Sequence, residues 1–103
     1  MQLSEAQLAD FEDGGWILLK ELFSPEEVAV LMDDVPRIFA LRREEVVREK
    51  DGKTPRTAFA AQYYSEPFRR LSRHPRLVEP VSQILGGPVY VHQFKINAKA
   101  AFD

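Results

Sequence analysis

The stretch Pro88-Val-Tyr-Val-His-Gln-Phe-Lys-Ile-Asn-Ala-Lys99 has the composition of a β-strand, because β-branched and aromatic residues dominate it. It follows Gly86 and Gly87, a pair that is typical of a turn. Successive side chains of a strand point to opposite faces of a sheet, so the stretch divides into two sets of residues. The two sets differ in polarity.

One face of this strand is apolar and is predicted to pack on a core. It carries Tyr90, His92, Phe94, Ile96 and Ala98. The other face changes from two valines to three polar side chains, which are Gln93, Lys95 and Asn97. Two interpretations of these three residues are open: they form a solvated strand face, or they converge on one ligand. His92 shares the apolar face, where a single histidine is more typical of a packed, hydrogen-bonded residue than of a metal ligand.

The composition is that of a globular protein of at most one domain: 103 residues, of which 45% are hydrophobic and 29% are charged. A formal net charge of −2 predicts no general affinity for nucleic acid or anionic membranes. No apolar run approaches the roughly 20 residues of a membrane span, and the polar N-terminus does not resemble a secretory signal. The absence of cysteine excludes disulfides and thiolate metal sites. We therefore expect a cytoplasmic protein.

Capping signals predict two helices in the first half of the chain. Ser4 precedes a helix over residues 5–13, and Ser24-Pro25 precedes a second helix. The apolar stripe of the second helix continues past Pro36. An interior proline removes a backbone donor, so we expect a kink or a break near Pro36, and the continuing stripe favours the kink.

Two further helices are expected in the second half. Ser65 is the candidate N-cap of a helix over residues 66–73. A helix over residues 75–85 follows His74, for which a surface or capping role is expected, and Gly86 ends this helix.

Two more strands and a charged loop complete the expected elements. Residues 16–19 are continuously apolar and predict a short strand buried on both faces, and residues 57–64 predict another strand. Residues 41–56 carry charges of both signs, which predicts a solvated helix end and loop. The interleaved acids argue against a nucleic-acid patch there.

The sequence resembles the phytanoyl-CoA dioxygenase family in two places. Tyr90-Val-His-Gln-Phe-Lys-Ile-Asn97, followed by Lys99 and Phe102, is similar to an early core strand of that family, in particular of its ectoine-hydroxylase-like branch. The first part of the chain resembles the usual N-terminal segment of family members. The residues that carry this resemblance are Leu3-Ser-Glu-Ala-Gln-Leu8, Phe11, Asp13-Gly-Gly-Trp-Ile17 and Leu22-Phe-Ser-Pro-Glu-Glu-Val28. The resemblance covers most of this chain but less than half of a typical member.

The resemblance implies an α+β fold in which N-terminal helices precede the first strands of a double-stranded β-helix, incomplete in this chain. It also implies Fe(II) and 2-oxoglutarate as cofactors and a small polar substrate. By position, Asn97 matches the asparagine that helps to hold 2-oxoglutarate, and Gln93 and Lys95 match positions that face the substrate. The ectoine-hydroxylase branch usually has arginine where this chain has Lys95, so an ectoine substrate is in doubt, whereas a carboxylate-bearing one remains compatible.

The iron ligands of that family, a His-x-Asp pair and a distant histidine, are absent from these 103 residues. Of the two histidines, His74 and His92, neither begins a His-x-Asp sequence. We therefore expect residues 1–103 to be the N-terminal part of one larger domain, with no turnover or specific Fe(II) binding of their own. The alternative is a non-catalytic α+β module that binds a partner, or a degenerate remnant of such an enzyme.

Overall fold

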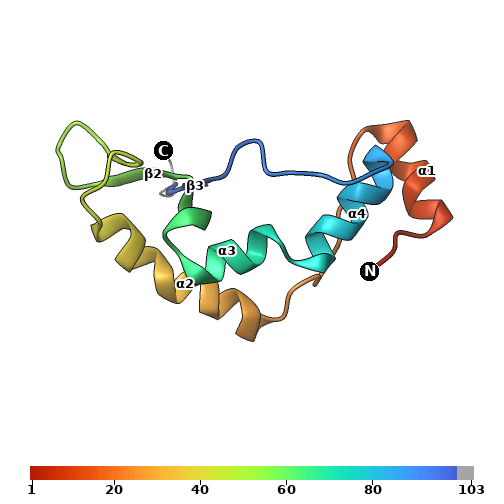
Figure 1. The fold of residues 1–103 in the computed structure, drawn as a ribbon, viewed down its shortest axis with the longest axis horizontal. Helices are drawn as coiled ribbons and strands as arrows, with labels where there is room; N and C mark the ends of the chain where they lie inside the picture. The colour runs from red at the N-terminus through yellow and green to blue at the C-terminus, as the bar shows by residue number, and fades with distance from the viewer. Residues whose placement is uncertain (100–103) are drawn as a thin grey trace.

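A computed structural model describes residues 1–99. In chain order its elements are α1 (Glu5–Gly14), α2 (Pro25–Ala40), β1 (Val46–Arg48), β2 (Pro55–Phe59), the 3-10 helix η1 (Ala61–Tyr63), α3 (Glu66–Ser72), α4 (Pro75–Leu85) and β3 (Lys95–Asn97). The strands lie at one end of an elongated molecule, and α1 and α4 lie together at the other end (Figure 1). Among residues 1–99, every helix is too short or too polar to span a lipid bilayer. The helices and the small antiparallel sheet confirm the expected α+β composition of the fold.

The helices begin where the capping signals predict. The Oγ atoms of Ser4 and Ser24 accept hydrogen bonds from the backbone N–H three residues later, each at 3.1 Å, and both sites form complete capping boxes. Ser65 caps α3, and the Nδ1 atom of His74 accepts a hydrogen bond from the Arg76 N–H at 3.2 Å at the start of α4. The capping role of His74 is therefore confirmed.

Pro36 does not interrupt α2, which is continuous from Pro25 to Ala40. Apolar residues on both sides of the proline, Leu31 and Val35 before it and Ile38 and Phe39 after it, pack on the same core. Because both halves of the stripe are held by one core, the loss of a single backbone hydrogen bond does not end the helix.

The three strands form one antiparallel sheet in the order β1-β2-β3. Ala58 pairs with Val46 on one side and with Ile96 on the other, so these three residues share the face that packs on α2 and α3. Ala58 is fully buried and Val46 is nearly so. The rings of Phe68 and Phe94 pack edge to face at the margin of this core, with their centroids 6.1 Å apart. The predicted apolar face is confirmed for Phe94 and Ile96, whereas Tyr90, His92 and Ala98, which were assigned to the same face, are exposed.

The strand expected from residue 88 onward is much shorter in the structure, because only Lys95–Asn97 pair with a neighbour. Its partner β2 ends at Phe59, where the left-handed backbone of Ala60 (φ 56°) turns the chain into η1. The Ala60 N–H still donates to the Phe94 carbonyl at 2.7 Å. Earlier residues find no strand to pair with, and Tyr90 is 86% exposed rather than buried.

One other strand prediction was wrong, one was right only in part, and the loop prediction for residues 41–56 missed a strand. Residues 16–19 form no strand, and Trp16 and Leu18 are exposed. The expected strand 57–64 begins earlier, at Pro55, and its second half is η1. Within the predicted loop 41–56, Val46–Arg48 form β1, because Val46 fills a core position beside Ala58 that its charged neighbours conceal in the sequence.

Candidate functional site

The face of the sheet opposite the core carries a hollow of about 460 Å³. Its described lining residues are Val47, Arg56, Thr57, Phe59, Lys95, Asn97, Ala98 and Lys99. The strand register creates this arrangement, because Thr57 lies opposite Asn97 and Phe59 lies opposite Lys95. We call this feature the sheet hollow.

A side-chain hydrogen bond joins β2 to β3 at the sheet hollow. The Oγ1 atom of Thr57 donates to the Oδ1 atom of Asn97 at 3.0 Å, across 40 residues of sequence. Thr57 is nearly buried, with 9% of its surface exposed, whereas Asn97 is exposed. Close beside this pair, the Ala98 N–H donates to the Arg56 carbonyl at 2.9 Å. The amide of Asn97 is therefore held from the β2 side and faces solvent on the other.

The charges around the sheet hollow are of one sign. Arg56, Lys95 and Lys99 line it, and none of its described lining residues is acidic. Cations beside an amide donor form a suitable environment for an anion that carries hydrogen-bond acceptors. The arrangement is therefore chemically suited to a carboxylate ligand.

The structure brings together two of the three polar residues singled out in the sequence. Lys95 and Asn97 both line the sheet hollow, whereas Gln93 is exposed in the irregular segment before β3 and is not among its lining residues. Thr57 and Arg56 were missed, because their part in the hollow depends on which strand pairs with β3, and no local signal carries that information. Phe102, part of the sequence resemblance, lies outside the described residues.

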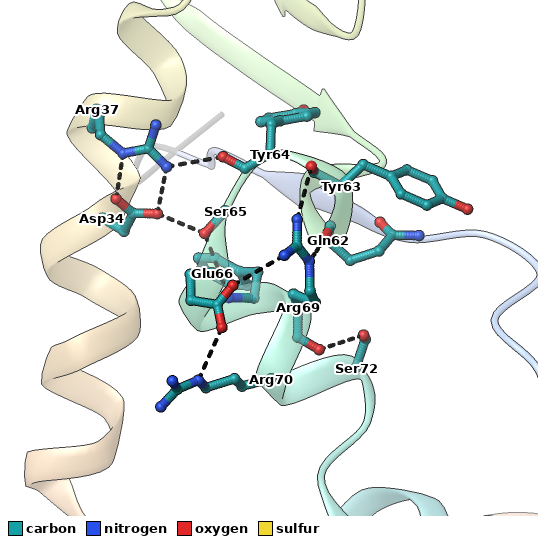
Figure 2. A network of polar contacts seen from close by, with 11 residues as sticks. Asp34, Arg37, Gln62, Tyr63, Tyr64, Ser65, Glu66, Arg69, Arg70 and Ser72 are labelled. Carbon is teal, nitrogen blue, oxygen red and sulfur yellow. Dashed lines mark hydrogen bonds and ion pairs between the residues drawn. The ribbon is translucent and has the colours of Figure 1, made fainter.

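A polar network fixes the turn that follows β2 (Figure 2). Arg37 donates to both carboxylate oxygens of Asp34, at 2.6 and 2.9 Å, and to the Tyr64 carbonyl at 3.0 Å. The Oγ atom of Ser65 donates to Asp34 at 2.6 Å, and the Arg37 guanidinium lowers the pKa of Asp34, with a smaller contribution from Ser65. The network attaches the chain between β2 and α3 to α2 and so supports the end of β2.

Arg69 strengthens the same turn from within α3. It donates to the carbonyls of Gln62 and Tyr63, both at 3.2 Å, and to the Glu66 carboxylate at 3.1 Å. All three contacts come from one guanidinium group (Figure 2). The Gln62 and Tyr63 carbonyls, which follow the left-handed residue Ala60, therefore accept hydrogen bonds from Arg69.

A second charged cluster joins the start of α4 to the start of α2. Arg76 pairs with the Glu27 carboxylate and donates to the Leu22 carbonyl at 2.7 Å, and its guanidinium lies 4.7 Å from the centre of the Phe23 ring. Hydrogen bonds from Arg76, and then from the Ser24 backbone, lower the pKa of Glu27 to about 2. Every member has a structural partner, so we assign this cluster to the fold.

Metal-ligating side chains do not gather anywhere within residues 1–99: no group of three or more His, Cys, Asp or Glu side chains lies together. His74 is engaged as a helix cap, and His92 is exposed in the segment between α4 and β3.

Comparison with known proteins relates this arrangement to one family. Residues 11–102 match the family described as Phytanoyl-CoA dioxygenase (PhyH). The chain is 41% identical over 104 residues to the ectoine dioxygenase of Bordetella parapertussis, an alignment that covers 97% of this chain and 34% of that protein. It is 38% identical over 89 residues to the L-proline trans-4-hydroxylase of Streptomyces griseoviridis, covering 86% of this chain and 33% of that protein.

Solved structures agree with the sequence comparison. The crystal structure of EctD from S. alaskensis with 2-oxoglutarate and 5-hydroxyectoine matches with a TM-score of 0.83 and 31% identity, covering 92% of this chain and 35% of that one. The structure of EctD with bound Fe matches with a TM-score of 0.84. The chain spans about a third of the length of the curated relatives it matches. From the match over residues 11–102, this chain belongs to the phytanoyl-CoA dioxygenase family.

Proposed function

We propose that this chain is the N-terminal part of a non-haem Fe(II)- and 2-oxoglutarate-dependent dioxygenase that hydroxylates a small polar metabolite. Its short sheet would then be the beginning of a double-stranded β-helix that the rest of a single larger domain completes. Family membership supports this proposal, and so do relatives named for the hydroxylation of ectoine and of L-proline. Iron and 2-oxoglutarate, when bound, would supply the oxidising chemistry.

Within this proposal, Asn97 helps to hold 2-oxoglutarate, and Lys95 and Gln93 face the substrate. The sheet hollow carries the assignments of Asn97 and Lys95, because an amide and cationic side chains occur there without an acidic neighbour among the described lining residues. This set of donors fits 2-oxoglutarate, a dianion whose oxygens only accept hydrogen bonds. A lysine at position 95 offers a point charge, which suits a substrate that carries a carboxylate. The assignment of Gln93 rests on its position in the family-like stretch alone.

Iron does not fit the described residues. No three His, Asp or Glu side chains converge within residues 1–99, and a facial triad needs three such ligands. The proposal therefore places the iron ligands outside this part of the polypeptide, and residues 1–99 contribute only to binding and orienting organic ligands.

A 2-oxoglutarate titration tests the proposal. The longest polypeptide that the gene encodes around this chain is titrated by isothermal calorimetry, with a redox-inert divalent metal in place of Fe(II). We expect saturable binding that Asn97→Ala weakens about 10- to 100-fold, the range for a hydrogen bond to a charged ligand. Folded protein that does not bind 2-oxoglutarate would contradict the dioxygenase proposal and favour a non-catalytic binding module.

A further inference from the structure

In this structure the hydrogen bond between Thr57 and Asn97 uses the acceptor end of the Asn97 amide. An asparagine amide has one acceptor end, Oδ1, and one donor end, Nδ2. Thr57 donates to Oδ1 at 3.0 Å, so the acceptor end is occupied from within the sheet. Within residues 1–99, no protein group receives a hydrogen bond from Nδ2, which leaves the donor end for a ligand in the sheet hollow.

Thr57 is well placed to hold this orientation. It lies directly opposite Asn97 in the register of β2 and β3, and a hydrogen-bonded backbone contact, Ala98 N–H to the Arg56 carbonyl, lies close beside the pair. Thr57 is nearly buried, so water has little access to the hydroxyl group. As a β-branched residue, threonine also has a restricted χ1 angle, which limits the directions that its hydroxyl can take.

The surrounding charges agree with a donor that faces the sheet hollow. Arg56, Lys95 and Lys99 attract a ligand rich in acceptor oxygens, and such a ligand needs the N–H end of the amide and not its carbonyl. A threonine hydroxyl can also accept, so the turned-over amide is disfavoured by the anion: its Oδ1 atom would face the oxygens of the anion and repel them.

We propose that Thr57 is a positioning residue: its hydroxyl holds the Asn97 amide so that Nδ2 donates to a carboxylate or keto oxygen of 2-oxoglutarate. The inference rests on the proposed function, and it adds a residue that acts through Asn97 and does not itself touch the ligand. It follows that the effect of Thr57 on binding must require both its hydroxyl group and the asparagine.

The test is a set of 2-oxoglutarate titrations by isothermal calorimetry on the longest polypeptide that the gene encodes, with a redox-inert metal. We expect Thr57→Val, which keeps the shape but removes the donor, to raise the dissociation constant about three- to tenfold, the range for one neutral hydrogen bond. Thr57→Ser keeps the hydroxyl and is expected to stay within about twofold of the parent. Thr54→Val is the matched control, because it removes a hydroxyl group from the same hairpin at a residue that does not line the sheet hollow. This variant should leave the affinity for 2-oxoglutarate unchanged.

Two further variants separate orientation from packing. Asn97→Asp still accepts from Thr57 but presents an acceptor to the ligand, so its affinity is expected to fall at least as far as that of Asn97→Ala. In the Asn97→Ala background, Thr57→Val is expected to have no further effect. Circular dichroism melts show which variants are folded, and Asn97→Asp still tests the orientation of the amide if Thr57→Val is not folded.

The outcomes distinguish this inference from the function on which it rests. Weak binding by Asn97→Ala together with parental affinity in Thr57→Val would overturn the role of Thr57 and leave the proposed function intact. Equal losses in Thr57→Val and Thr57→Ser, a further loss in the Asn97→Ala background, or parental affinity in Asn97→Asp would also overturn it. Parental affinity in Asn97→Ala would instead remove the assignment of Asn97 to the cofactor.

Discussion

Ser65 is the residue whose replacement by alanine should show how α2 holds α3. Only 1% of Ser65 is exposed, and its Oγ atom bonds in two directions. It donates to the Asp34 carboxylate at 2.6 Å, which joins α3 to α2, and it accepts from the Phe68 N–H at 3.4 Å, which caps α3. Ser65→Ala removes both contacts at once (Figure 2).

The expected loss can be worked out from these two contacts. A hydrogen bond to a charged group contributes about 1.5–3 kcal/mol net, and a helix N-cap about 1 kcal/mol. The capping contact is long, so its contribution lies at the low end of its range. We expect Ser65→Ala to lower the free energy of unfolding by about 2–3 kcal/mol. Ser4→Ala is the matched control, because Ser4 caps α1 at 3.1 Å without bonding to a carboxylate in residues 1–99, and about 1 kcal/mol is expected.

Urea denaturation followed by circular dichroism measures both losses, and a double-mutant cycle with Asp34→Ala isolates the bond between the helices. The pKa of Asp34 is lowered in the folded state, mainly by Arg37, so the stability contributed by its carboxylate is present above its ordinary pKa of 3.8. It is lost as the pH falls through the folded-state value. The reasoning is refuted if, at neutral pH, Ser65→Ala costs no more than Ser4→Ala, or if the cycle gives a coupling energy below ~0.3 kcal/mol.

Two further predictions concern the helices. Arg76→Met should return the pKa of Glu27 from about 2 toward its ordinary value of 4.5; because the folded-state pKa is the lower one, the ion pair stabilises the fold above about pH 4.5 and this is lost as the pH falls toward 2. A carboxyl-carbon NMR titration checks the shift, and an unchanged Glu27 pKa would show that Arg76 is not its cause. Ile38→Ala, at a position with no exposed surface, should cost about 2–5 kcal/mol in urea denaturation. Val30→Ala, on the exposed side of the same helix, should cost less than ~0.5 kcal/mol, and similar losses for the two would contradict the placement of the core.

The helices could be predicted because their signals are local. A serine and the backbone N–H three residues later lie within one turn, so the caps at Ser4, Ser24 and Ser65 need no information from the rest of the chain. The strands were predicted less well, because a strand needs a partner. Residues 88–94 have strand composition, but β2 ends at Phe59 and offers them no edge.

In the candidate site, too, some residues could be predicted from local sequence and others could not. Lys95 and Asn97 could be singled out from alternation along one stretch and from resemblance to a family. Gln93 belongs to the same alternation, yet it lies outside the lining of the sheet hollow, because the regular pleat begins only at Lys95. Thr57 carries no signal of its own, since a threonine in a short strand is ordinary.

The starts of the helices and the relation to a family can be read from the amino-acid sequence, because they depend on neighbouring residues and on local composition. The pairing of β2 with β3, which places Thr57 opposite Asn97 across 40 residues, became known from the three-dimensional arrangement. Strand register is set by long-range backbone pairing and by burial of one face of the sheet, and a slip of one residue would exchange the two faces.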